Sequence, residues 1–367
     1  MATWEATLVA ATPQAGGAAT LAELDPLSWT KLEVVDELGA PGSATMDVPV
    51  DRLSDRNKAR LANLRDNPAE VWIRRTTGPT TSPLVFAGPA MSCRIKGRTL
   101  TIVAAGLLSY LEYWAADTNV IAALAGSAVP QYQFASVDQA TIVKQLVDAW
   151  QALPYGNDGI VTTGIAPTGV PRDLTLTTAE TPGIAALVAT MGSRENGFDL
   201  SVDPATRQLT IWYPRRGVDK TATVILDRRS IGEPDVAWTV APGTIGSEAF
   251  ASSSSTTGTA LTSIQSNTTL RASFGRSYVR RSFQDISLQA TLDDHAARVL
   301  TDMGSQVLTV APTLVPVTGF SWGDFGPGDL ISYDYDAGVG RQTGTPRVAK
   351  ITATLDTGTE ILKVVLL

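Results

Sequence analysis

Short runs of apolar and β-branched residues, separated by turn residues, dominate both ends of the chain. In residues 1–105 this pattern predicts a series of strands, with a hairpin turn at Lys96-Gly97-Arg98. One short helix is expected there, capped by Ser54. The same β pattern returns in residues 216–367, where one helix is predicted over about 291–303, capped by Thr291. Both end segments are therefore expected to be mainly β.

The middle of the chain, residues 106–215, changes to helical periodicity. Ser136 and Gln139 have the spacing of a capping box, and apolar residues follow at helical intervals. A second helix is predicted to begin at Thr181, with Pro182 in its first turn. A hairpin over residues 198–213 then turns at Asp203-Pro204. The predicted fold is mainly β with an α/β insertion, divided into residues 1–105, 106–215 and 216–367.

The two β segments show a weak internal similarity. In each, a helix is followed by a strand, a glycine-containing loop, a second strand, a polar turn and a third strand. An internal duplication explains this order, but any two β-meanders would align about as well. Both explanations stay open.

Composition and charge exclude several classes of protein. Of the 367 residues, 44% are hydrophobic and 18% charged, which is too apolar for a chain that is disordered throughout. The formal net charge of -7 argues against a sequence-general nucleic-acid binder, which needs a basic footprint. Residues 1–14 lack the pattern of a signal peptide, and the apolar run 100–111 is too short to span a bilayer.

The chain has one cysteine and one histidine. An internal disulfide and a zinc site of Cys and His ligands are therefore excluded. Cys93 lies in an apolar strand and is expected to be a small buried hydrophobic residue. His295, near the start of the last helix, is expected to be a surface or hydrogen-bonded residue.

The motifs of nucleotide-binding proteins and serine hydrolases are incomplete. Gly217, Lys220 and Thr221 lack the glycine that precedes the lysine of a phosphate-binding loop. The glycines at 338, 340 and 344 lie between strands, where a dinucleotide site needs a following helix. Ser28 and Lys31 have the spacing of penicillin-recognising enzymes but fall in a predicted strand. We predict no catalytic residue, no cofactor and no cofactor-binding residue.

Four carboxylates, Asp324, Asp329, Asp334 and Asp336, cluster within thirteen residues. Asp334 and Asp336 would share one face of a strand. The segment lacks the third acidic position and distal glutamate of a calcium-binding EF-hand loop. A solvated hairpin end is expected, without a metal site. A cation site and a catalytic pair for glycan hydrolysis remain alternatives.

A basic cluster lies in the last third of the chain. It consists of Arg276, Arg280 and Arg281, beside Tyr278 and Phe283. A solvated strand face explains it, and so does a subunit contact, since arginine and aromatic residues are enriched at interfaces.

Several stretches follow one another in an order found in a known family. They are Leu24-Asp25, residues 44–49, residues 85–89, residues 95–102 running into 106–111, residues 197–200 with Asp203-Pro204, and residues 325–330 before Arg347-Val348. This order resembles the tail-tip hub, or minor tail, proteins of long-tailed phages that infect actinobacteria. The resemblance covers nearly the whole chain and rests on order and spacing, because no single motif is diagnostic.

The resemblance implies a definite assembly. Members of the family resemble the baseplate hub of contractile phages, with two tail-tube-like β-sandwich or barrel domains flanking an inserted α/β domain. Three copies form a ring that caps the tail tube. Its implied partners are the tube protein, the distal tail protein, the tape-measure protein and a central fibre or spike. The genome passes through the ring, without sequence-specific nucleic-acid binding or membrane insertion.

The family also implies a protein made in the host cytoplasm and placed in the virion tail tip, without enzymatic activity. The Ser/Thr-rich residues 251–269 would then be an interface or lumen loop that becomes ordered only on assembly. Two alternatives are a cell-wall-degrading enzyme that uses the carboxylates near Asp329 and a glycan-binding adhesin. The adhesin would use some of the eight tryptophans, which are Trp4, Trp29, Trp72, Trp114, Trp150, Trp212, Trp238 and Trp322.

Overall fold

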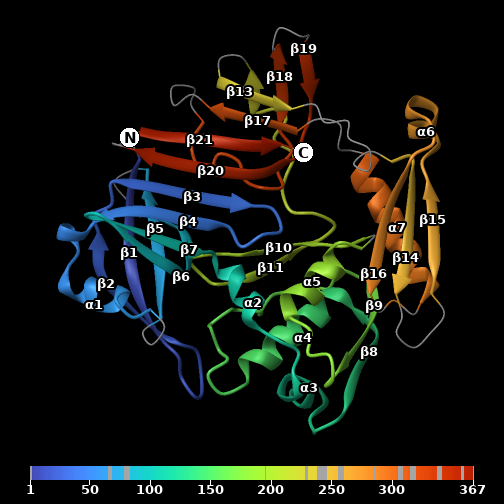
Figure 1. Ribbon diagram of the computed structural model, residues 1–367, viewed down its shortest axis with the longest axis horizontal. Helices are drawn as coiled ribbons and strands as arrows, with labels where there is room; N and C mark the ends of the chain where they lie inside the picture. Colours follow the sequence, from blue (N-terminus) through green and yellow to red (C-terminus); the bar gives the residue numbers. More distant parts are fainter. Residues whose placement is uncertain are drawn as a thin grey trace.

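The computed structural model describes most of the chain, and its strands outnumber its helices, which confirms the mainly β fold class (Figure 1). The described residues are 2–64, 68–77, 83–194, 196–227, 230–237, 246–254, 260–284, 286, 288–304, 309–314, 320–336, 341–356 and 359–366. Among the helices of this part, none is long and apolar enough to cross a membrane.

One sheet of eleven strands joins the beginning of the chain to its end. Its order is β13-β17-β21-β20-β3-β4-β7-β6-β5-β1-β2. The early strands are β1 (Thr3–Thr12), β2 (Thr20–Leu27), β3 (Lys31–Glu37), β4 (Ser43–Pro49), β5 (Ala69–Thr76), β6 (Leu84–Lys96) and β7 (Thr99–Ala105). The late strands are β13 (Ile231–Ala237), β17 (Thr309–Leu314), β20 (Val348–Asp356) and β21 (Thr359–Leu366). The two groups meet where β3 pairs with β20, with Lys31 opposite Asp356.

Strict alternation of apolar and polar residues builds the core of this sheet. In β4, Ala44, Met46 and Val48 are buried while the residues between them are partly exposed. The core also takes in Leu61 of α1 (Asp55–Leu61), a helix that begins after Ser54. The Ser54 hydroxyl accepts a hydrogen bond from the Asn57 N–H at 3.2 Å, so the predicted cap is confirmed. A single-turn 3₁₀ helix, η1 (Val50–Arg52), precedes α1.

The middle segment folds around a second core. Its elements are η2 (Leu107–Ser109), α2 (Tyr110–Tyr113), α3 (Thr118–Ala125), β8 (Gln131–Asp138), α4 (Gln139–Gln151), β9 (Pro171–Thr177), α5 (Ile184–Gly192), β10 (Asp199–Val202) and β11 (Leu209–Trp212). The buried face of α4 carries Ile142, Val143, Leu146 and Val147, as its periodicity predicted. The predicted hairpin is β10–β11, whose strands pair in antiparallel register.

Two predicted helix starts in this segment are wrong. Asp138, and not Ser136, caps α4: its Oδ1 accepts hydrogen bonds from the N–H groups of Ala140 and Thr141 at 2.9 and 3.2 Å. Ser136 has a φ of 54° and lies in β8. The helix predicted from Thr181 begins at Ile184, because Thr181 itself has a φ of 38° and Gly183 is the cap.

Residues 246–304 form a separate lobe, which we call the β14–β16 lobe. It contains β14 (Glu248–Ser254), β15 (Thr262–Ser266), α6 (Thr268–Phe274), β16 (Tyr278–Gln284) and α7 (Gln289–Gly304). Its strands form a sheet of order β15-β14-β16, and α7 packs on β14 and β15. Its small core consists of Ala251, Ile286, Leu292 and Ala296.

Two predictions for the residues of this lobe are wrong. Residues 251–254 and 262–266 belong to two strands of a hairpin, so the interface or lumen loop expected over 251–269 is wrong as a loop for these residues. Residues 255–259 lie outside the described part. The last helix begins at Gln289, two residues before the predicted cap Thr291. Serine and threonine look loop-like in sequence but also suit a half-exposed strand face.

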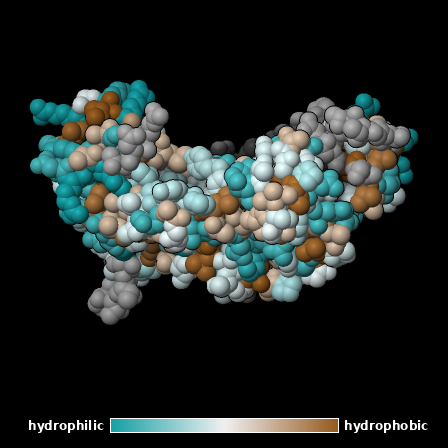
Figure 2. Space-filling model, turned by 90° about the horizontal axis from the view of Figure 1, so that it is seen from below, coloured by the Kyte–Doolittle hydropathy of each residue, from teal (hydrophilic) through white to brown (hydrophobic). Residues whose placement is uncertain are grey.

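A small mixed sheet completes the fold. In it β12 (Ile225–Asp227) pairs in parallel with β18 (Ser332–Asp336), which pairs with β19 (Arg341–Gly344). Viewed from below, the molecule is hollowed along one side between two raised ends, and the β14–β16 lobe forms the end at right (Figure 2).

Candidate functional site at the junction of the segments

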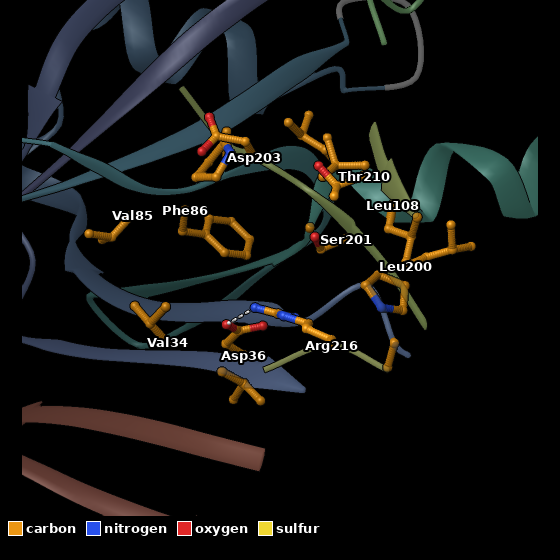
Figure 3. A pocket seen from close by; sticks show the side chains of 18 of the residues that line it. Val34, Asp36, Val85, Phe86, Leu108, Leu200, Ser201, Asp203, Thr210 and Arg216 are labelled. Carbon is orange, nitrogen blue, oxygen red and sulfur yellow. Dashed lines mark hydrogen bonds and ion pairs between the residues drawn. The ribbon is translucent and has the colours of Figure 1, made fainter. Parts of the chain in front are cut away.

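A groove lies where the early strands, the middle segment and the late strands meet. It encloses about 310 Å³ between β3, β6 and the β10–β11 hairpin. Figure 3 shows Phe86, Ser201 and Arg216 pointing into this space from three different parts of the chain. A second hollow of about 350 Å³ shares four lining residues with it, namely Asp36, Trp212, Arg216 and Trp322. The two hollows therefore adjoin, and together they form the junction groove.

An ion pair lies between the two hollows. Arg216 Nη2 is 3.2 Å from Asp36 Oδ2, so the residues after the β10–β11 hairpin are tied to the end of β3. Both side chains are partly exposed. The pair is therefore open to solvent and to a partner, and Trp212, which is 39% exposed, lies beside it in the lining.

Asp199 links the middle segment to the late strands. Its Oδ2 accepts hydrogen bonds from the backbone N–H of Arg216 at 2.8 Å and from Arg347 Nη2 at 2.5 Å. Arg347 also donates from Nη2 to the carbonyl of Arg216 at 2.7 Å and from Nε to the carbonyl of Gly328 at 3.1 Å. One guanidinium thus holds three segments in register through charge-assisted bonds.

Two glycines allow the backbones to meet at this point. Gly217 and Gly328 have backbone φ values of 104° and 99°, which residues other than glycine rarely adopt. A Cβ on Gly217 would lie 2.1 Å from the Gly328 carbonyl carbon, and a Cβ on Gly328 would lie 2.4 Å from the Arg216 carbonyl oxygen. The close approach of the two loops therefore requires glycine at both positions.

A buried carboxylate locks the middle segment onto β5. Glu70 is 1% exposed and accepts hydrogen bonds from Trp72 Nε1 at 2.8 Å, from the Tyr110 hydroxyl at 2.7 Å and from both Nη atoms of Arg207. Burial, together with the Glu70 carboxylate, raises the pKa of Tyr110, so its hydroxyl stays protonated and donates. Arg207 also donates to the carbonyl of Asp158 at 2.6 Å.

A third polar cluster joins β21 to β1 and β5. Glu360 Oε2 accepts from Trp4 Nε1 and from Arg75 Nη2, both at 3.1 Å, and Glu360 Oε1 accepts from the backbone N–H of Trp322 at 2.8 Å. Together with the Asp199 and Glu70 clusters, it fixes the described segments to one another by directional contacts.

The clustered carboxylates do not converge on a site. Asp329 is 6% exposed; it accepts from the N–H groups of Val218 and Gly326, both at 2.9 Å, and Lys220 Nζ lies 3.0 Å away. Asp334 pairs with Arg341 across the β18–β19 hairpin, which lowers its pKa. Asp324 accepts from the N–H of Ser321 at 2.6 Å. Within the described ranges, no group of acidic, histidine or cysteine residues could hold a metal ion.

His295 is a buried residue of the β14–β16 lobe. It is 2% exposed and stacks on Phe283 with ring centroids 4.3 Å apart. Burial and the nearby Arg194 and Arg172 lower its pKa to about 4, so its ring is neutral at pH 7. Its burial makes the expectation of a surface histidine wrong, and its Nε2 has no hydrogen-bond partner among the residues that the structure describes.

Cys93 is half-buried and packs at the edge of the main core, and burial raises its pKa to about 11. It is therefore a protonated thiol at neutral pH, in line with the hydrophobic role expected from its strand.

The tryptophans are dispersed. Trp4 packs edge-on against Trp322, and Trp114 stacks with Trp150, each with ring centroids about 6 Å apart. Trp4 and Trp114 are buried, and Trp238 lies outside the described residues. This dispersed arrangement suits packing in the cores and lining of the junction groove better than it suits stacking on a sugar.

The residues that form the junction were not predicted. Asp36, Asp199, Arg216 and Arg347 are ordinary charged residues in sequence, and their partners lie up to 180 positions away. The nearest signals were the hairpin turn at Asp203-Pro204 and the glycine-rich residues 325–330, both of which border the groove.

Comparisons with known proteins find similarity in structure only. No protein family profile and no curated protein sequence matches the chain. The 43 kDa tail protein of prophage MuSo2 from Shewanella oneidensis matches with a TM-score of 0.63 at 13% identity, over 99% of this chain and 97% of that one. The tail protein from Neisseria meningitidis MC58 matches at 0.59 and 15% identity, over 99% and 96%.

A third match is the prophage tail protein gp18 from Listeria monocytogenes EGD-e. Its TM-score is 0.56 at 8% identity, with 98% of this chain and 94% of that chain covered. All three matches are end to end, so they include both the β segments and the middle segment. The chain is similar to these proteins in structure, and it has the fold of phage tail proteins.

Proposed function

We propose that this chain is a structural protein of a phage tail and forms the hub at the tail tip. The observation that carries the proposal is the end-to-end match to two tail proteins, one of them from a prophage, with nearly the same coverage on both chains. The clusters around Asp199, Glu70 and Glu360 support it, since they fix the segments as a rigid body suited to bear load.

In this proposal three copies form a ring that caps the tail tube. The ring joins the tube protein and the distal tail protein to a central fibre or spike, and the tape-measure protein and the genome pass through it. We also propose residues 1–105 and 216–367 as the two tail-tube-like β units and residues 106–215 as the insert. The protein would reside in the virion, reach it from the host cytoplasm and act without catalysis. An origin in a phage of actinobacteria is part of the same proposal.

The structural use of the carboxylates also supports a role without catalysis. Asp329 accepts from two backbone N–H groups and Asp334 pairs with Arg341, so both carboxylates have structural partners.

The proposal is tested by imaging phage tails that contain the chain. Cryo-electron microscopy of intact tails is expected to show a threefold ring of this chain at the tip, in contact with the tube. Light scattering on the purified 38.7 kDa chain over a concentration series is expected to approach three times that mass. Tails in which the chain is absent from the tip would overturn the proposal.

A further inference from the structure

One face of the sheet in the β14–β16 lobe is left uncovered. Side chains along each strand point alternately to the two faces of the sheet, and Ala249, Ala251 and Val279 are buried on the face towards α7. The opposite side, which we call the open face, carries Phe250, Ile264, Tyr278 and Arg280, with Ser252, Thr262 and Ser282 around them. No described helix or strand packs extensively against this side.

The open face has the composition of a contact surface. Ile264, Phe250 and Arg280 are neighbours across the three strands, and Ile264 is 54% and Tyr278 40% exposed. The guanidinium carbon of Arg280 lies 5.9 Å from the centre of the Phe250 ring. Apolar and aromatic side chains mixed with arginine are enriched at protein interfaces, and the largest binding contributions come from such residues.

A buried carboxylate, Glu248, orders the side chains around Tyr278 on this face. Glu248 is 1% exposed, and its Oε1 accepts from Arg276 Nε at 2.8 Å and Arg271 Nη1 at 3.1 Å. Arg276 in turn lies 5.3 Å from the centre of the Tyr278 ring. The Tyr278 hydroxyl and Arg276 lower the pKa of Glu248, which keeps it ionised. Side chains that are already ordered lose less entropy when a partner binds.

The charge of the open face indicates what kind of partner binds it. Residues 246–284, which include the three strands, contain four arginines and one acidic residue, Glu248, whereas the whole lobe has five residues of each sign and the whole chain has 36 acidic and 29 basic residues. The excess of acid therefore lies outside the lobe. The part of a second copy outside the lobe is net negative and residues 246–284 are net positive, and such complementarity steers two copies together.

The position of the lobe agrees with a contact between copies. The β14–β16 lobe lies at one end of the molecule, and β1, β2 and α1 lie at the other (Figure 1). A contact from the end of one copy to a different surface of the next is heterologous, and it closes into a ring when the rotation fits. We propose that the open face of the β14–β16 lobe binds the neighbouring copy of this chain. This inference rests on the proposed ring.

Two substitutions on the open face test the inference, each with a matched control. Ile264→Asp and Arg280→Glu are expected to raise the self-association dissociation constant at least about 100-fold, as large losses at interface hot spots do. The controls are Ile225→Asp and Arg98→Glu, at exposed positions outside the lobe, and they are expected to leave self-association unchanged. Sedimentation velocity gives the constants, and circular dichroism verifies folding. Open-face variants that associate like the wild type would overturn the inference while leaving the ring intact.

A cross-link identifies the partner in assembled tails, including the case in which the purified chain stays monomeric. The substitution Ile264→Cys places a thiol on the open face, and Cys93 is the one native thiol. A second substitution, Asp55→Cys, places a thiol on the exposed side of α1 at the opposite end of the molecule. A bismaleimide is expected to link chains that carry both substitutions to one another. Cross-links only to a different tail protein would overturn the inference but not the proposed function. Failure of the wild type to enter tails would overturn the proposed function itself.

A polyanion is the competing occupant. Fluorescence anisotropy with a labelled DNA duplex at physiological salt is expected to show no binding that depends on Arg280. If Arg280→Glu abolishes DNA binding and leaves self-association unchanged, the face is a nucleic-acid site and the inference is wrong.

Discussion

Arg207 and Glu70 form a two-point ion pair across 137 positions of the sequence. Arg207 Nη1 lies 3.1 and 3.0 Å from the two carboxylate oxygens, and Nη2 lies 3.1 Å from Oε1. Glu70 belongs to β5 of the large sheet, and Arg207 lies in the turn of the β10–β11 hairpin. The pair therefore fixes the middle segment to the sheet at a largely buried site.

Replacing Glu70 by Gln is expected to lower the free energy of unfolding by about 3–5 kcal/mol, because Arg207 is left as a buried charge without a counter-ion. Urea unfolding followed by circular dichroism measures the loss. The control is Glu23→Gln, which removes the exposed Arg74–Glu23 pair at 2.6 Å and is expected to cost less than about 1 kcal/mol. Equal losses for the two variants would contradict this role for Glu70.

Two glycines of one loop are expected to respond differently to alanine. Gly328→Ala places a methyl group 2.4 Å from the Arg216 carbonyl oxygen in a backbone conformation that alanine resists, so it is expected to lower the melting temperature. Gly326→Ala is the control, since a Cβ there would meet no atom within 4 Å. Differential scanning fluorimetry measures both. A neutral Gly328→Ala would mean that the junction loops separate readily.

Features that depend on neighbouring residues could be predicted from the sequence, whereas contacts between distant segments could not. Local patterns predicted the mainly β class, the Ser54 cap, the buried face of α4 and the β10–β11 hairpin, because each depends on neighbours within a few residues. The start of α4 was missed because Asp138 competes with Ser136 for the cap. The junction groove was not predicted, since a charged residue such as Asp199 carries no local sign of a partner 148 positions away.

The carboxylates near the end of the chain are expected to matter for stability and not for catalysis. Asp329→Ala leaves two backbone N–H groups without their acceptor and removes the carboxylate partner of Lys220, and is expected to cost about 2–3 kcal/mol. Asp334→Asn weakens only an exposed pair and is expected to cost less than about 1 kcal/mol.

Zymography on bacterial cell walls is the companion measurement. The wild type is expected to give no clearing. Clearing that disappears in Asp334→Asn at unchanged stability would restore the cell-wall enzyme as the better explanation.

Acid is expected to destabilise the protein through His295. Its folded pKa of about 4 is below the ordinary value of 6.5, so the unfolded chain takes up the proton first. The contribution of the neutral histidine is complete above pH 6.5 and declines as the pH falls towards 4. The wild type should lose about 3 kcal/mol more than His295→Gln between pH 7 and pH 4.

Urea unfolding at a series of pH values tests this expectation. The groups that face the histidine are Arg172 and Arg194, and Asp294 lies beside Arg172. Parallel pH profiles for the wild type and His295→Gln would show that His295 does not titrate in this range.

Cys93 is expected to react slowly with iodoacetamide in the folded protein. Its pKa of about 11 leaves almost no thiolate at pH 8, whereas unfolding restores the ordinary value and the reactivity. Mass spectrometry of the alkylated chain, with and without urea, measures the two rates. Fast alkylation of the folded protein would mean that the edge of the core opens in solution.

The pairing of β3 with β20 has a consequence for how the protein is made. The edge of β3 that β20 covers is left bare until residues more than 300 positions later have left the ribosome, as the register of Lys31 with Asp356 requires. A bare edge on an apolar sheet is a site of wrong pairing between nascent chains. Contacts this distant in sequence also slow folding. Synthesis of the protein therefore contains a waiting period, in which the sheet stays unfinished until the last strands complete it.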